Sequence, residues 1–181
     1  MNIDQEYNKI LHQLKAGGRP NIKLSKSDFS QLLSLWPKPV QYNQKKEVFL
    51  KILCILENTQ NFAPQFLNPI IEVLENSKDK ELVIHTLGIS QKHILSCFQM
   101  KGERVPISFI KSIGHALGSS EPEVIEWGLR VLEQSGSAGI LLKEDVRSLN
   151  IPFFKRWNSK WKIVSSLKNF ILNQWKPLGP R

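Results

Sequence analysis

Apolar residues recur at three- and four-residue steps along nearly the whole chain, which is the spacing of amphipathic α-helices. Glycines and prolines break this pattern into pieces of helical length. No run alternates apolar and polar residues with enrichment in β-branched side chains, so the pattern does not predict a β-sheet. It predicts an all-α protein of nine to ten helices.

The breakers give the bounds of these helices. Gly17 ends the first helix, and Ser27 is the expected cap of the second. Pro64, Pro106 and Pro122 suit first turns, where the missing amide hydrogen costs no helical bond. The predicted helices after the first are 27–36, 43–57, 64–74, 79–88, 90–100, 106–117, 122–134, 139–149 and 158–175.

Two helix pairs in the middle of the chain resemble each other. The segment 121–132 begins with an acidic-proline-acidic turn, and the segment 79–88 aligns with it so that Leu82 matches Val124, 42 residues later. The helices before these two segments keep almost the same step of 43 residues. The matching pairs there are Leu67 with Ile110, Ile70 with Ile113, and Leu74 with Leu117.

This double match resembles the HEAT repeat, whose period is about 40–47 residues. The resemblance is carried by residues 63–134 and extends over 27–175, with a weaker copy in which Val48 precedes Leu82 by 34 residues. Pro69 is expected inside the first helix of its pair, where it would kink the helix as in many HEAT-like units.

The resemblance implies a short right-handed solenoid of antiparallel helical hairpins, because one hairpin cannot bury both of its apolar faces. Residues 1–181 are then one domain, with 1–20 as an N-terminal capping helix and 176–181 as a flexible tail. In such stacks the second helices line a concave face, which is the usual binding surface.

Composition and charge narrow the classes of partner. The chain has 181 residues, 41% of them hydrophobic, a formal net charge of +9 and a pI near 9.6. This charge favours acidic partners, namely nucleic acid, an anionic membrane surface or an acidic protein. Cys54 and Cys97 lie in apolar helical contexts and are expected as buried free thiols in a reducing, cytoplasmic setting. No signal peptide and no membrane-spanning run is recognised in the sequence.

Lys51, His85 and Trp127 share one position of the repeat, so we expect them to line up across the stack. With Arg130 they form a candidate binding row for an acidic or aromatic ligand. The alternative is that this position fills the edge of the core, because aromatic residues at helical spacing are most often packing residues.

The C-terminal region is basic and aromatic. From Val146 to Arg181 the chain has no Asp or Glu, and Trp157, Trp161 and Trp175 are interleaved with lysines and arginines. Such a mixture suits nucleic acid, since cations meet phosphates and rings meet bases. The alternative is a capping helix with a buried apolar stripe and a solvated face. The candidate contact residues here are Lys162, Asn169 and Lys176.

Catalytic and metal-binding patterns are not found. The four histidines show no metal-ligand spacing, and the glycines form no phosphate-binding loop or nucleophile elbow, so no metal and no cofactor is predicted. We therefore favour a non-catalytic scaffold that binds an acidic protein through its concave face, and we lean against an enzyme.

The main alternative is a nucleic-acid-binding protein, or an enzyme similar to the HEAT-like alkylpurine DNA glycosylases. Those enzymes use a concave cleft with tryptophans and a carboxylate, and Asp145 is the only aspartate near the basic region. A membrane-surface role is a third hypothesis. It is less favoured because the polar face of 158–175 has few lysines for an interfacial helix.

Overall fold

The computed structural model describes residues 1–151 and 158–176. In these ranges the chain is helical, apart from loops and one isolated β-bridge between Ile22 and Thr59, so the all-α prediction is confirmed. The elements are α1 (Ile3–Lys15), α2 (Lys26–Ser34), η1 (Pro39–Gln41), α3 (Lys46–Glu57), η2 (Pro64–Phe66), α4 (Leu67–Asn76), α5 (Lys80–Ser90), η3 (Gln91–Ser96), α6 (Cys97–Met100), α7 (Ile107–Leu117), α8 (Pro122–Gln134), η4 (Gly136–Leu142), α9 (Lys143–Ser148) and α10 (Ser159–Gln174).

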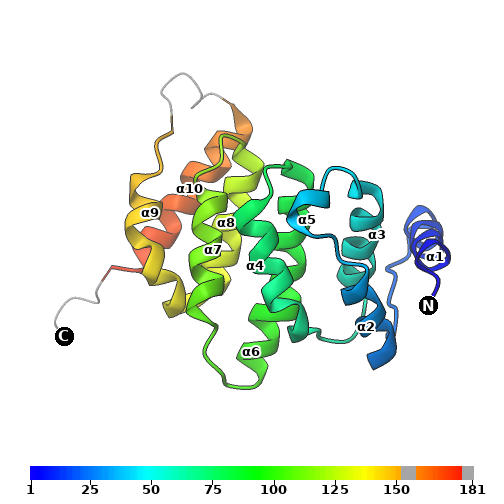
Figure 1. Ribbon diagram of the computed structural model, residues 1–181. Helices are drawn as coiled ribbons and strands as arrows, with labels where there is room; N and C mark the ends of the chain where they lie inside the picture. Colours follow the sequence, from blue (N-terminus) through cyan, green and yellow to red (C-terminus); the bar gives the residue numbers. More distant parts are fainter. Residues whose placement is uncertain (152–157, 177–181) are drawn as a thin grey trace.

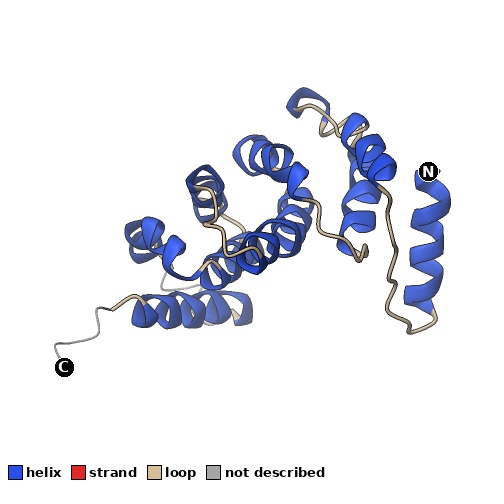
Figure 2. Cartoon of the chain, turned by 90° about the horizontal axis from the view of Figure 1, so that it is seen from below, coloured by secondary structure: helices blue, strands red, loops and turns tan. Residues whose placement is uncertain are grey.

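The helices form two layers (Figures 1 and 2). The second row consists of α3, α5, α8 and α10, each packed on the next, and the first row contains α4, α7 and α9. Contacts of α4 with α5, of α7 with α8 and of α9 with α10 join the rows. The fully buried core residues lie mainly between the two rows, where neighbouring helices bury their apolar stripes against each other.

The N-terminal unit is less regular than the rest. Figure 2 shows α1 beside α3, at the end of the molecule away from α10. The short turn η1 packs on α4. The ring of Trp36 lies 4.7 Å from that of Phe49 and 5.3 Å from that of Phe66, and Phe29 of α2 meets Phe66 edge-on at 6.4 Å. An aromatic cluster therefore joins this unit to α3 and η2.

The helix predicted to end near Gly88 does not end there. The chain stays helical from α5 through η3 to α6, so the separate helix predicted at 90–100 is wrong. A glycine inside a helix weakens it by only about 1 kcal/mol, and tertiary packing overrides that cost. Ile89 and Leu87, on either side of Gly88, are buried and hold the helix in place.

The segment η3 is a π-helix, and it places His93 in the interior. The Nδ1 atom of His93 accepts a hydrogen bond from the Ala63 amide at 3.1 Å, and its Nε2 atom donates to the Leu56 carbonyl at 2.9 Å. This one ring therefore joins the end of α3, the start of η2 and the long helix. Burial lowers the pKa of His93 to about 4, against a smaller opposing effect of the bond to Leu56.

Two predicted helix starts also differ. Ser25, and not Ser27, caps α2: its hydroxyl accepts from the Asp28 amide while the Asp28 carboxylate accepts from the Ser25 amide. Pro69 is the third residue of α4, directly after the tighter turn η2. It therefore lies in the first turn and not in the helix interior, where a kink was expected.

The C-terminal pair was predicted as helices 139–149 and 158–175. The first is a 3-10 turn, η4, followed by the short α9, whereas α10 closely matches its prediction. Gly139 explains the packing at this end, because a Cβ atom there would lie 2.9 Å from the Trp175 ring and 2.9 Å from the Leu132 carbonyl oxygen. Residues 177–181 of the predicted tail, and Trp157, lie outside the described residues.

A candidate binding face on the second row

The predicted row lies on corresponding second-row helices: Lys51 on α3, His85 on α5 and Trp127 on α8. All three side chains are half-buried. Trp127 packs against the core, which confirms the core-edge alternative for it, and because it is only half-buried part of the side chain stays accessible to solvent. What each residue can bind then depends on its partners within the chain.

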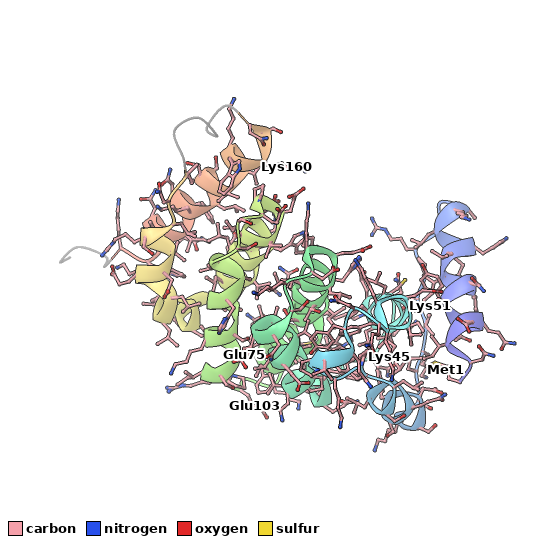
Figure 3. The ribbon with its side chains drawn as sticks, turned by 45° about the horizontal axis from the view of Figure 1, so that its top comes forward. Met1, Lys45, Lys51, Glu75, Glu103 and Lys160 are labelled. Atoms are coloured by element: carbon pink, nitrogen blue, oxygen red, sulfur yellow. The ribbon has the colours of Figure 1, made fainter. Side chains whose placement is uncertain are left out.

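Lys51 is engaged by carboxylates of its own chain. Its Nζ atom lies 2.6 Å from Glu47 and 2.8 Å from Asp4 of α1, and 5.9 Å from the centre of the Tyr7 ring. Figure 3 shows Lys51 between α3 and α1. The hydrogen bonds that the Lys51 ammonium donates to Asp4 and Glu47 raise the pKa of Lys51. Lys51 therefore fastens α1 to α3 and is not a free cation for a ligand.

His85 and Arg130 are paired in a similar way. The Nδ1 atom of His85 lies 3.6 Å from the Glu57 carboxylate, and this contact raises the pKa of His85 despite partial burial. The guanidinium of Arg130 donates to Glu126, one turn earlier on α8, from Nη2 at 2.8 Å and from Nε at 3.0 Å. Lys51, His85 and Arg130 thus each lie against a glutamate of α3 or α8.

A ladder of ion pairs links the starts of the second-row helices. Lys46, the first residue of α3, lies 2.7 Å from Asp79 and 3.0 Å from Glu81, the cap and second residue of α5. Partial burial on its own would raise the pKa of Asp79. The hydrogen bonds that Asp79 accepts from Lys46 and from backbone amides outweigh burial, so the pKa of Asp79 lies below its usual value. Asp79 caps α5 as its sequence position suggested, through the amides of Glu81 and Leu82.

The next step of this ladder has the same form. Lys80, the first residue of α5, lies 3.8 Å from Glu121 and 2.9 Å from Glu123, the cap and second residue of α8. At α10 the positions of lysine and acid are exchanged. The lysine, Lys160, is the second residue of the later helix, α10, and it pairs with Glu123 of the preceding helix, α8. Figure 3 labels Lys160 at the start of α10. Hydrogen bonds from Lys160 and Lys80 together lower the pKa of Glu123 to about 2. We call these contacts the N-terminal ladder.

The second row also borders an open hollow of about 690 Å³. Trp127, Arg130 and Glu133 of α8 lie on one side of it, and Gln91 and Gln174 come from η3 and α10. The hollow therefore brings together residues of three helical elements that are far apart in the chain. Sequence reasoning identified Trp127 and Arg130 here and missed Glu133 and the glutamines, because a polar residue on a helix face gives no signal of what lies opposite.

The last helix, α10, has the two faces that its pattern predicted. Trp161, Val164, Ile171 and Trp175 are buried, which confirms the core stripe. On the other side Lys162, Asn169 and Lys176 are exposed. Within 1–151 and 158–176 no carboxylate forms an ion pair with Lys162 or Lys176. These two lysines are available to an outside anion, unlike Lys51.

Asp145, the carboxylate considered for a glycosylase, lies elsewhere. It borders a different hollow of about 320 Å³, formed by α7, α9 and the start of α10. Trp161 lines that hollow too, whereas Trp127 and Arg130 line the larger one. The structure therefore does not bring Asp145 together with Trp127 around one cavity.

Within 1–151 and 158–176, His, Cys, Asp and Glu side chains form no group of three able to hold a metal ion. Each helix in the same ranges is too short or too polar to cross a lipid bilayer. Cys54 and Cys97 are free thiols, half-buried and buried respectively.

Comparison of the chain with protein-family models, with curated proteins and with solved structures gave no match.

Proposed function

We propose that the protein is a non-catalytic interaction module that binds another protein through the exposed face of the second row. The observation that carries the proposal is the N-terminal ladder. Asp79 and Glu121 occupy the N-cap positions of α5 and α8, 42 residues apart, and each forms an ion pair with the first lysine of the preceding second-row helix. Equivalent helices packed by equivalent contacts favour the HEAT-like, right-handed solenoid arrangement, whose second helices offer one continuous surface.

The charge distribution favours an acidic protein as the partner. On α3, α5 and α8 the glutamates outnumber the lysines and arginines, so the excess positive charge of the chain lies elsewhere. The acid-free helix α10 is one such region: Lys162 and Asn169 are exposed on it, and Lys176 is exposed just beyond its C-terminal end. Such a field steers an acidic partner over about 10 Å at 0.1 M salt, without specifying the contacts that follow. The free thiols suit a cytoplasmic location.

A capture experiment tests this function. The purified protein is used as bait, its partner is identified, and the dissociation constant is measured by calorimetry. Because aromatic residues at the centre of an interface carry about 2 kcal/mol or more, Trp127→Ala should weaken binding more than tenfold. Ile107→Ser, at an exposed apolar residue at the start of α7 in the first row, is the matched control. Equal binding by both variants and the parent would refute the use of this face.

Nucleic-acid binding is the second candidate, and the acid-free α10 favours it. Fluorescence titration with labelled single- and double-stranded DNA at several salt concentrations separates the two. Phosphate contacts by Lys162 and Lys176 would give binding that falls steeply with salt and weakens in the double Lys→Ala variant. Binding that is absent at low salt, or insensitive to salt, would exclude this candidate.

A further inference from the structure

Glu133 stands apart from the other carboxylates of the second row. On α3, α5 and α8, including their caps, each other Asp or Glu pairs with a lysine, arginine or histidine side chain of the chain. Over the described residues Glu133 forms no such pair, although it is half-buried and borders the larger hollow. A partly desolvated carboxylate gains most when a ligand brings the missing cation.

The surroundings of Glu133 suit a guanidinium group. Trp127 borders the same hollow, and an indole ring attracts a cation lying over its face. The amide oxygens of Gln91 and Gln174 are further acceptors for N–H groups at this hollow. A planar guanidinium can stack on a ring and donate to a carboxylate with two parallel bonds, which the compact ammonium of lysine cannot do.

Arg130 borders the hollow as well, and its charge must be considered. Its guanidinium donates two hydrogen bonds to Glu126, which compensate that charge locally. Arg130 does not pair with Glu133, although the two are three residues apart on α8. The arrangement therefore keeps one cation tied to Glu126 and leaves Glu133 for a second one.

An apolar stripe continues from the hollow along α10. Phe170, Leu167 and Ile163 precede Gln174 by four, seven and eleven residues, so all four lie on one helix face. Ile163 is 41% exposed and Phe170 47% exposed, while Leu167 is half-buried. A helix that inserts a side chain at Gln174 can therefore place apolar residues along this stripe.

We propose that the hollow receives an arginine side chain of the protein partner, presented by an amphipathic helix whose apolar residues lie on Ile163, Leu167 and Phe170. This rests on the proposed function, since it specifies one contact of the same interface. An arginine contact is compatible with a partner of net negative charge. Electrostatic steering depends on the charge of the whole partner, whereas this contact depends on one residue of it.

Titration of the intact protein with Nα-acetyl-arginine amide, followed by nuclear magnetic resonance of the tryptophan indole N–H groups, tests the proposal. The Trp127 signal is assigned by its loss in Trp127→Phe. We expect it to shift and saturate in roughly the millimolar range. The uncharged isostere Nα-acetyl-citrulline amide should leave it in place. A helical peptide with one arginine and leucines at the spacing of the α10 stripe should bind tighter, and Phe170→Ser should remove that gain.

Glu133→Gln should weaken binding of the arginine amide about tenfold or more. Glu57→Gln is the matched control, because Glu57 occupies the corresponding position near the end of α3 but pairs with His85. It should bind like the parent. Thermal unfolding of each variant shows that it is folded.

The proposal is overturned if the Trp127 signal does not move, if citrulline amide moves it equally, or if Glu133→Gln binds arginine amide like the parent. Failure of the proposed function is a separate result. If Trp127→Ala abolishes partner capture while arginine amide has no effect, the interaction face stands and the arginine contact falls. If arginine amide binds as expected while partner capture ignores the second row, the hollow is a small-cation site and the interface lies elsewhere.

Discussion

Two regions of the molecule differ: the central pairs, α4–α5 and α7–α8, and the N-terminal unit around α3. Both contribute a helix to the second row, but the elements that pack against that helix are different. In the central pairs α5 starts after the cap Asp79 and α8 starts at Pro122, and the matched apolar residues recur 42 or 43 residues later. Around α3 the spacing shortens to 34 residues, and an aromatic cluster and the crossing helix α1 replace the regular neighbours. A row of helices can therefore keep its packing contacts from one helix to the next while the elements that cover one of its members differ.

The largest expected effect is a loss of folding stability, and it tests whether the packing of α3 stabilises the fold as much as the packing of α5 and α8. Leu53, Leu87 and Leu129 occupy corresponding positions and are all fully buried. Each Leu→Ala substitution should cost about 2–5 kcal/mol, because it removes apolar area and leaves a cavity. Urea unfolding followed by circular dichroism measures the cost. A cost below about 1 kcal/mol at Leu53 alone would show that α3 is packed differently from its central counterparts.

The junction between the two regions should be sensitive to pH. His93 has a pKa of about 4 when folded and 6.5 as its ordinary value, so the unfolded chain binds more protons between these values. Its contribution is fully present above pH 6.5 and declines as the pH falls. We expect a loss of about 2 kcal/mol between pH 7 and pH 5.

Urea unfolding at a series of pH values measures this loss, and His93→Gln should flatten the profile. His85 acts with the opposite sign, since its raised pKa stabilises the fold below pH 6.5 and this contribution is lost as the pH rises. His85→Gln should therefore steepen the fall toward pH 5. A parent protein equally stable at pH 7 and pH 5 would contradict the role assigned to the His93 bridge.

The smallest of the three effects concerns the C-terminal end. Gly139→Ala should destabilise by about 1–3 kcal/mol, because its Cβ would lie 2.7 Å from Ser135 Oγ and 2.9 Å from the Trp175 ring. Gly88→Ala is the matched control in α5, where an added Cβ meets no atom within 4 Å. It should stabilise by up to about 1 kcal/mol through helix propensity. Thermal unfolding of both variants checks the contrast; equal melting temperatures would refute close packing at Gly139.

Much of the fold was predictable from apolar spacing and breakers. The bounds of α8 and the start of α5 at Asp79 agree with the prediction, because proline and aspartate act locally at helix starts. The continuation of the helix through Gly88 was not predictable, since burial of its neighbours decides it. The π-helix at His93 was also missed, because its cause is a pair of backbone partners more than 29 residues away in the chain.

The candidate site shows the same limit. Lys51, His85 and Trp127 were grouped by their position in the predicted repeat, and they lie on the successive second-row helices α3, α5 and α8. Their pairing with Asp4, Glu57 and the core was not visible, because charge counts do not say which carboxylate lies opposite a lysine. For the same reason the lack of an ion pair at Glu133, over the described residues, becomes apparent only once the other carboxylates of α3, α5 and α8 have been assigned their partners.

The reversal of the N-terminal ladder at α10 has a consequence for how the chain avoids misfolding. Several second-row helices have similar apolar stripes, so hydrophobic collapse alone would tolerate exchanged neighbours. The first lysine of α3 or α5 pairs with acidic residues at the start of the next second-row helix. Lys160 at the start of α10 would instead repel such a lysine, and it pairs with Glu123 of α8. The charges at the helix starts thus specify which helices pack side by side. Packing α10 beside α8 brings opposite charges together, whereas exchanging neighbours brings like charges together.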